Sequence, residues 1–469
     1  MSNLVKNTLL VGVSEIASKG IIALAMILLV RTLAPESYGL YSLAITLTYF
    51  FIGFLHSGFY TIGMREVAKY PELATKYVNN VTTLKIFLSL LSYVLLVVIV
   101  QFLGKPTEAK IAFYLAGLFL FILVFHIDWL FRGIDKMEIT SLGSIMQGTS
   151  LLIFIYFFVK NPDDLHRAVV VYLGSWSIYI VFEVLVYFIQ KGPIRFEYDS
   201  AFNKKLLKES LPISFSSLII AIYANINVVV LNIYKGDYET GIYSAMIRLM
   251  NILLLPNSIL QISFFPELSR SVLSGAVKLS QRKYLLVLFV IGFFVIFGML
   301  GYSYEVIGFV FGRKYLVGDA IFKVSLIACF FSYLSASAVV VSLALGKQKN
   351  FFYATIVGVG VSLISNLILV PRFGAMGAVI SLSITEFIVF FILMLLNRDN
   401  TLFEPYKAIL KPLLVAFASF LCSKCIEIPT SSLLGLISYF LIFLILASWT
   451  KILNKDLILK LVKFGGGSD

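Results

Sequence analysis

Apolar runs long enough to cross a membrane follow one another along almost the whole chain, and this pattern limits the fold more than any other feature. As a helix, a run of about 20 residues spans a hydrocarbon core about 30 Å thick. Only 13% of the 469 residues are charged and 59% are hydrophobic. A soluble protein of this size needs more charged residues to cover its surface. The residue alternation of membrane β-barrels is absent. We therefore predict an all-α integral membrane protein.

Fourteen runs are predicted to cross the membrane as helices. The first run has full spanning length and lacks a small-residue cleavage site, so it should be kept as a helix and not removed as a signal peptide. No segment between the runs is long enough to form a soluble domain. The predicted spans are residues 8–32, 39–64, 80–103, 110–132, 138–159, 168–190, 211–234, 239–264, 284–311, 318–345, 350–370, 375–397, 407–424 and 432–450.

The basic residues gather in the loops on one side of the predicted membrane. If the N-terminus is cytoplasmic, 24 of the 38 Lys and Arg residues lie in cytoplasmic segments, 10 in outer segments and four within spans. This asymmetry predicts a protein of the plasma (inner) membrane with both termini cytoplasmic. The net charge of +13 then reflects topology and contact with anionic lipid headgroups, and not nucleic-acid binding.

Two halves of the chain share short stretches of sequence. Residues 38–45 align with residues 240–247 at a shift of 202, and residues 181–183 align with residues 384–386 at a shift of 203. Six spans per half give both copies the same polarity, which predicts a parallel repeat about an axis along the membrane normal. The alternative is chance similarity between apolar segments. The predicted regions are an N-terminal six-helix lobe (1–190), a cytoplasmic linker (191–210), a C-terminal six-helix lobe (211–398), and two additional helices with a cytoplasmic tail (399–469).

Three motifs carry a resemblance to a known family. Residues 31–41 read Arg-Thr-Leu-Ala-Pro-Glu-Ser-Tyr-Gly-Leu-Tyr, at the turn after the first span. Residues 128–133 read Asp-Trp-Leu-Phe-Arg-Gly at the end of the fourth span. Residues 366–371 read Asn-Leu-Ile-Leu-Val-Pro, and Gly-Ala-Met-Gly-Ala follows at 374–378. With these motifs in this order over nearly its whole length, the chain resembles the Wzx-type polysaccharide flippases of the multidrug/oligosaccharidyl-lipid/polysaccharide exporter (MOP) superfamily.

The resemblance implies a two-lobed bundle with a central cavity and two extra C-terminal helices. It implies a substrate as well: an oligosaccharide on polyprenyl pyrophosphate, moved from the cytoplasmic to the outer leaflet by alternating access. Polysaccharide assembly proteins would then be partners. The superfamily also contains drug and lipid II exporters, so membership leaves the cargo open.

Four basic residues are candidates for binding such a substrate. A pyrophosphate needs compensating charge in a low-dielectric region, and Lys19 and Arg248 lie within spans of opposite halves. Arg31 and Arg65 lie near span ends, where long side chains can reach the interface. The alternatives are a packing pair between Lys19 and Glu15, four residues apart, and bonds from Arg248 to backbone carbonyls.

Four acidic residues within or near spans are candidates for ion coupling: Glu15, Asp128, Glu183 and Glu386. Asp128 shares a helix face with Arg132, and the two glutamates of the repeat occupy matching places. The alternative for these glutamates is a packing role. Coupling to protons, to sodium or to the membrane potential stays open. His56 and His126, also within spans, are interpreted as structural.

Other functions fit the sequence less well. An ion-coupled multidrug or other lipid exporter of the same superfamily is the nearest alternative, but buried basic residues favour an anionic cargo. A membrane-embedded glycan polymerase or acyltransferase would need a catalytic cluster on a long outer loop, which the chain lacks. It also lacks a Walker A loop and zinc-type Cys/His spacing. We therefore expect no enzyme activity, no cofactor and no metal, and interpret Cys422 and Cys425 as packing residues.

Overall fold

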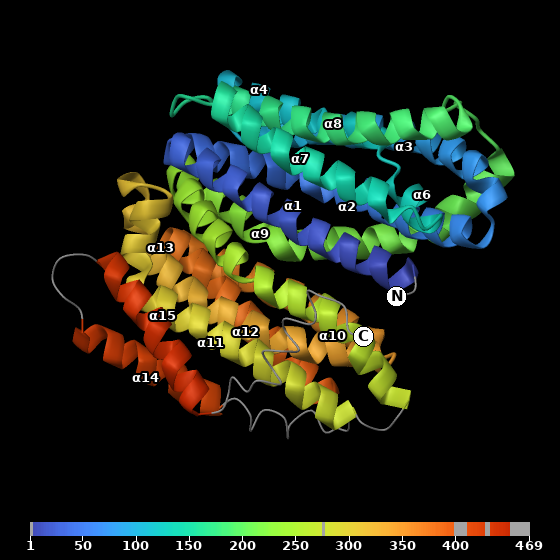
Figure 1. Ribbon diagram of the computed structural model, residues 1–469. Coiled ribbons are helices and arrows are strands. Elements are labelled where there is room, and N and C mark those ends of the chain that lie inside the picture. Colours follow the sequence, from blue (N-terminus) through green and yellow to red (C-terminus); the bar gives the residue numbers. More distant parts are fainter. Residues whose placement is uncertain (1–2, 274–276, 398–409, 427–431, 451–469) are drawn as a thin grey trace. The chain divides into compact units, whose positions relative to one another are not determined.

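The computed structural model describes residues 3–273, 277–397, 410–426 and 432–450, and all regular secondary structure in these ranges is helical (Figure 1). Nine helical stretches in them are long and apolar enough to cross a membrane. The chain is thus a multi-pass α-helical membrane protein, as predicted. It divides into two compact units, Met1–Gly241 and Ile242–Asp469. Parts of the predicted fourth region, residues 399–409 and 451–469, lie outside the described residues.

The N-terminal unit is built around α2, which packs against α3, α4, α6 and α8, while α7 packs between α1 and α8. Proline at the first position of α2 supplies the backbone angle with which a helix begins. The helices are α1 (Asn3–Thr32), α2 (Pro35–Lys69), η1 (Pro71–Leu73), α3 (Ala74–Phe102), α4 (Thr107–Gly117), α5 (Phe119–Ile122), η2 (Leu123–Phe125), α6 (Asp128–Gly133), α7 (Met137–Phe158), α8 (Leu165–Lys191) and the first part of α9 (Ser200–Leu253).

The C-terminal unit is centred on α11 and α12. In it α11 packs against α14 and α15, and α12 packs against α10 and α13. Aromatic rings fill much of this packing, as in the contact of Phe294 with Tyr439, whose ring centroids lie 5.5 Å apart. The helices are α10 (Leu255–Leu273), α11 (Val277–Val310), η3 (Arg313–Gly318), α12 (Asp319–Ala344), α13 (Gln348–Leu396), α14 (Leu410–Ile426) and α15 (Ser432–Trp449).

Two of the long helices break at a glycine. Gly236 in α9 has φ 82° and Gly374 in α13 has φ 58°, a region of backbone angles that glycine enters without steric cost. The breaks fall between predicted spans 211–234 and 239–264, and between 350–370 and 375–397. The sequence thus separated these segments correctly, while the total number of crossings stays a prediction.

The fourth predicted span, residues 110–132, lies in the helical stretch Thr107–Gly133, which is long and apolar enough to cross a membrane. The prediction of one continuous helix there is wrong. The chain leaves α4 after Gly117, passes through α5 and η2, and is extended at His126 before α6 begins at Asp128. An uninterrupted apolar run from Phe119 to Phe125 gave no sign of this break. The backbone groups that the break frees are bonded by buried side chains of other helices, which is what makes irregular backbone tolerable at membrane depth.

Two glycines of the predicted repeat touch each other's backbone. A Cβ on Gly39 would overlap the carbonyl oxygen of Asp237, and a Cβ on Gly241 would overlap that of Pro35. Both pairs, 39 with 241 and 35 with 237, are related by the predicted shift of 202 residues. A reciprocal contact of this kind is expected between two copies of a repeat, and glycine permits the close approach between helices.

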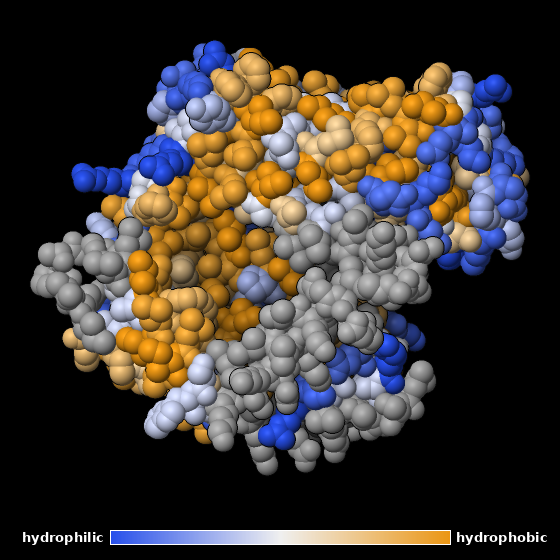
Figure 2. Space-filling view, in the orientation of Figure 1, coloured by the Kyte–Doolittle hydropathy of each residue, from blue (hydrophilic) through white to orange (hydrophobic). Residues whose placement is uncertain are grey.

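The surface of the helices is apolar where lipid would cover it. Phe87, Leu90 and Leu91 on α3 are each more than half exposed. Figure 2 shows hydrophobic side chains in orange along the helices of the N-terminal unit and hydrophilic ones in blue near their ends. Apolar flanks with polar ends are the pattern of a bundle that spans a bilayer.

Candidate functional site

The break between η2 and α6 lies in a group of ionisable side chains inside the N-terminal unit. Five helices and the break itself contribute to this group, which we name the charge cluster. Its members are Glu15 (α1), His56 (α2), Lys85 (α3), His126 (the break), Asp128 and Arg132 (α6), and Glu183 (α8). Ionisable residues are rare inside membrane-spanning bundles and mark functional sites by default.

His126 lies between two carboxylates. Its Nδ1 is 2.7 Å from Oε2 of Glu183, and its Nε2 is 3.5 Å from Oδ1 of Asp128. Glu183 is fully buried, and the same Oε2 accepts the backbone N–H of Ile127 at 3.3 Å. Because a carboxylate can only accept, Nδ1 of His126 carries a hydrogen. A second proton on Nε2 would then be directed at Asp128, so the geometry favours an imidazolium.

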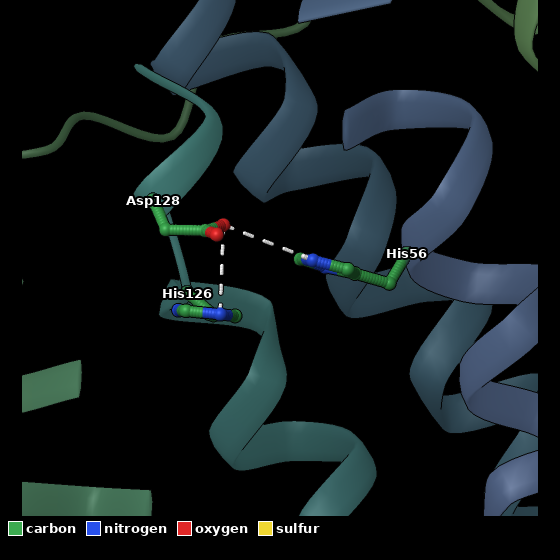
Figure 3. Close-up of side chains that lie close together, drawn as sticks. All are labelled: His56, His126 and Asp128. Carbon is green, nitrogen blue, oxygen red and sulfur yellow. Dashed lines mark ion pairs between the residues drawn. The ribbon is translucent and has the colours of Figure 1, made fainter. Parts of the chain in front are cut away.

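His56 approaches the same carboxylate from α2. Figure 3 shows both histidines directed at Asp128, with Nε2 of His56 3.9 Å from Oδ1. The two imidazole rings are stacked, with centroids 5.1 Å apart and planes 9° from parallel. Nδ1 of His56 lies 3.2 Å from Nζ of Lys85. Since an ammonium only donates, Nδ1 accepts, and the hydrogen of neutral His56 is on Nε2, facing Asp128.

Three groups of the cluster are close enough together to raise the possibility of a metal ion. One atom each from His56, His126 and Asp128 lie within 4.8 Å of one another. A metal ligand needs a free lone pair, however, and the lone pair of His56 faces Lys85 and not the other two groups. The ammonium of Lys85 and the guanidinium of Arg132 add positive charge at the same place. The donor set therefore does not suit a metal ion.

Aromatic side chains of α8 close the cluster off. The ring of Tyr179 meets that of His126 edge-on at 5.1 Å, and Trp176 does so at 5.7 Å. Tyr179 also donates a hydrogen bond from its hydroxyl to the carbonyl of Thr140 on α7, at 3.2 Å. It fits there because α7 has Gly143, where a Cβ would overlap the tyrosine ring. A low-dielectric wall of this kind strengthens every charge interaction inside it.

Charged contacts continue outward from the buried core. Nε of Arg132 lies 3.6 Å from Oδ2 of Asp128, as their spacing of four residues predicts. Nη1 of Arg132 lies 3.5 Å from Oε1 of Glu15. The exposed fraction of the side chain rises along this path, from 0% at Glu183 and 9% at Asp128 to 26% at Arg132 and 29% at Glu15. The cluster therefore connects the buried carboxylate of Glu183 to the partly exposed carboxylate of Glu15.

The structure brings three of the four ion-coupling candidates together in one place. Glu15, Asp128 and Glu183 all belong to the charge cluster. Glu386 lies in the C-terminal unit, on α13, where it is half-buried and accepts a hydrogen bond of 2.9 Å from Ser332. Their role in coupling stays a proposal.

The four substrate-binding candidates lie outside the charge cluster. Lys19 is exposed on α1, and the predicted pairing partner Glu15 contacts Arg132 instead. Arg31 is exposed near the end of α1, and Arg248 is half-buried in the part of α9 that belongs to the C-terminal unit.

Arg65 on α2 is held by two carboxylates, at 2.7 Å by Glu66 and at 2.5 Å by Glu209 of α9. Part of its charge is therefore already compensated. The structure thus offers a structural role for Arg65 beside the predicted one.

Four members of the charge cluster were not predicted as functional. Arg132 was only paired with Asp128 by its spacing. His56 and His126 were interpreted as structural, and Lys85 was only counted as lying within a span. These last three come from different parts of the chain, so no local spacing joins them. The usable signal in the sequence was an amino acid of high cost at membrane depth, above all Lys85 within the predicted span 80–103.

Solved structures share this fold. The chain matches "Lipid II flippase MurJ, inward closed conformation" with a TM-score of 0.72 and 17% identity, over 96% of this chain and 99% of that one. It matches an inward-facing multidrug resistance MATE family transporter of the MOP superfamily with a TM-score of 0.61 and 17% identity, over 81% and 94% of the two chains. At this identity the likeness concerns the fold alone.

Curated relatives and one family model match in sequence. A putative O-antigen transporter of Shigella dysenteriae is 25% identical over 59% of this chain and 70% of its own length. One from Escherichia coli (strain K12) is 26% identical over 80% of this chain and 92% of its own length. The family model described as polysaccharide biosynthesis protein matches residues 4–272, more than half of the chain. The chain therefore belongs to the polysaccharide biosynthesis protein family, and it shares its fold with the MurJ and MATE structures.

Proposed function

We propose that the protein is an alternating-access flippase that moves a polyprenyl-pyrophosphate-linked oligosaccharide from the cytoplasmic to the outer leaflet of the plasma membrane. The family is one of polysaccharide biosynthesis, and the curated relatives are described as putative O-antigen transporters. The fold is shared with a structure described as a lipid II flippase. The protein would serve assembly proteins that build and polymerise the oligosaccharide.

The charge cluster is the observation that carries this proposal. Burying two carboxylates, Asp128 and Glu183, beside a buried lysine is expensive. Ionisable residues at such depth mark ion pathways in membrane proteins. A scaffold would gain more stability from apolar residues at the same places. We assign ion coupling to Glu183, Asp128 and Glu15, with His126 between the first two.

The substrate residues of the proposal are Lys19 and Arg248, with Arg31 at the end of α1. An exposed ammonium on α1 can hold a pyrophosphate, and sugar hydroxyls can bond to nearby polar and aromatic groups. Arg65 is a weaker candidate because two carboxylates already contact it.

Flipping of a labelled polyprenyl-pyrophosphate oligosaccharide in proteoliposomes tests the function. Wild-type protein is expected to move the lipid, and Lys19→Ala and Arg248→Ala are expected to slow transport at least tenfold, a loss of about 1.4 kcal/mol of substrate stabilisation. Lys110→Ala is the matched control, because Lys110 bonds to Gln101 on the neighbouring helix, away from the charge cluster. Export of a cationic dye with no movement of the lipid-linked sugar would replace this function by drug export.

A further inference from the structure

We propose that Lys85 makes the charge cluster selective for protons over metal cations, so that a proton is the coupling ion. The inference rests on the proposed transport function and adds the identity of the ion and the residue that selects it. Lys85 belongs to α3, is 2% exposed, and places its ammonium at the helix break. Nothing in the sequence motifs or in the spacing of the acidic residues points to this lysine.

The first argument concerns the backbone carbonyl that the break releases. In transporters with discontinuous helices, carbonyls freed by unwinding coordinate sodium or protons. Here the freed carbonyl of His126 accepts a hydrogen bond from Nζ of Lys85 at 3.3 Å. The ammonium thus occupies the position that a metal cation would use, and its charge repels a second cation there. Removing the ammonium would open a carbonyl and two carboxylates to a cation.

The second argument is a count of charges. Glu15, Asp128 and Glu183 carry three negative charges, and Lys85 and Arg132 carry two positive ones. One negative charge is left over when both imidazoles are neutral, and one bound proton removes it. Two buried carboxylate oxygens, Oδ1 of Asp128 and Oε1 of Glu183, have no hydrogen-bond partner. Each of them can therefore accept a hydrogen bond from a group that takes up a proton.

His126 is the group that holds this proton. Nε2 forms an N–H bond on uptake and directs it at Asp128, 3.5 Å away, and the same bond breaks on release. His56 is a poorer acceptor because the ammonium of Lys85 faces its Nδ1. The titratable and charged groups around His126 are Glu15 of α1, His56 and Tyr60 of α2, Lys85 of α3, Asp128 and Arg132 of α6, and Tyr179 and Glu183 of α8.

Ion binding to the purified protein in detergent, without substrate, tests the inference. Sodium is titrated by calorimetry into wild type, Lys85→Met and Lys85→Arg. We expect no saturable heat with wild type or Lys85→Arg, and a saturable heat with Lys85→Met. Lys110→Met is the matched control at a lysine outside the cluster and should behave as wild type. In parallel, proton uptake in weakly buffered solution should fall by about one proton per chain in His126→Gln, by the charge count above.

Two outcomes would overturn the inference. One is saturable sodium binding to wild type, which shows that Lys85 does not exclude the cation. The other is unchanged proton uptake in His126→Gln. Sodium binding to wild type and proton uptake by His126→Gln can both be measured even if Lys85→Met is not recovered in a folded state. They also need no transport, so a failure of the flipping assay would be seen separately from a failure of the ion assignment.

Discussion

Glu183 and Glu386 occupy matching places in the two halves of the chain, yet their surroundings differ. Glu183 is fully buried on α8 and is bonded by His126 and by the backbone of Ile127. Glu386 is half-buried on α13 and accepts a hydrogen bond from Ser332. The predicted repeat therefore has a carboxylate in both halves, and the one in the N-terminal unit lies among further ionisable groups.

The same shift of 203 residues extends the comparison to the helix break. It places Cys329 at the position of His126 and Phe331 at that of Asp128, both on α12. Cys329 is fully buried, and the ring of Phe331 packs on that of Phe387 with centroids 5.1 Å apart. Aromatic packing thus stands in the C-terminal unit where the N-terminal unit has ionisable groups.

The largest expected difference between the two units is the effect of removing each glutamate's charge. While His126 is protonated, Glu183→Gln leaves one positive charge of the cluster uncompensated, so we expect the free energy of unfolding to fall by about 3–5 kcal/mol. Glu386→Gln keeps an acceptor for Ser332 and should lower it by less than about 1 kcal/mol. Thermal unfolding in detergent, followed by intrinsic fluorescence, measures both. Equal losses in the two variants would remove the contrast between the units.

A smaller effect is expected at the reciprocal glycine contact. Gly39→Ala places a Cβ against the carbonyl of Asp237, and the helices must separate, at a cost of about 1–3 kcal/mol. Gly360→Ala in α13 is the matched control, because a Cβ there meets nothing within 4 Å. That change should be neutral or stabilising by up to about 1 kcal/mol, since alanine favours a helix. The account of the contact fails if the two variants unfold at the same temperature.

The smallest expected effect lies at the rim of the N-terminal unit, in the loop between α7 and α8. Partial burial acts to raise the pKa of Asp164, but hydrogen bonds from the backbone N–H groups of Asn161 and Lys160 outweigh it and hold the pKa below its ordinary value of 3.8. A carboxyl group with a lowered folded-state pKa stabilises the fold above the unfolded-state pKa, and this stabilisation is lost as the pH falls through the folded-state value.

The test is the difference in stability between wild type and Asp164→Asn as a function of pH. At neutral pH the variant should be less stable by no more than about 1 kcal/mol, because the site is close to solvent. The difference should shrink as the pH falls below the ordinary value of 3.8. A difference that stays constant over this range would mean that the loop does not depend on the charge of Asp164.

Most of the helices could be predicted from the sequence because each apolar run is bounded by polar or basic residues. The breaks in α9 and α13 were also predicted, since Gly236 and Gly374 follow such boundaries. The break before α6 was missed because its cause lies elsewhere: Lys85 and Glu183, from α3 and α8, bond the backbone groups that it frees. Tertiary contacts of this kind produce no periodic pattern in the local sequence, so they cannot be predicted from it.

The candidate site shows the same limit. Asp128 and Arg132 could be paired from their spacing within one helix, and the structure confirms the contact. Glu15 could be placed near Lys19 by the same rule, but its contact is Arg132, on a helix more than 100 residues away in sequence. Spacing predicts neighbours along a helix, whereas the partners across helices depend on packing that a single sequence does not reveal.

The central claim, that the N-terminal charge cluster couples transport to an ion, is tested most directly by flipping under an imposed pH gradient. A labelled polyprenyl-pyrophosphate oligosaccharide is followed in proteoliposomes containing wild type, Glu183→Gln or Glu386→Gln, with and without the gradient. We predict that the gradient accelerates flipping by wild type and by Glu386→Gln, and has no effect on folded, inserted Glu183→Gln. A Glu183→Gln variant that responds to the gradient as wild type does, or a response lost only in Glu386→Gln, would contradict the claim.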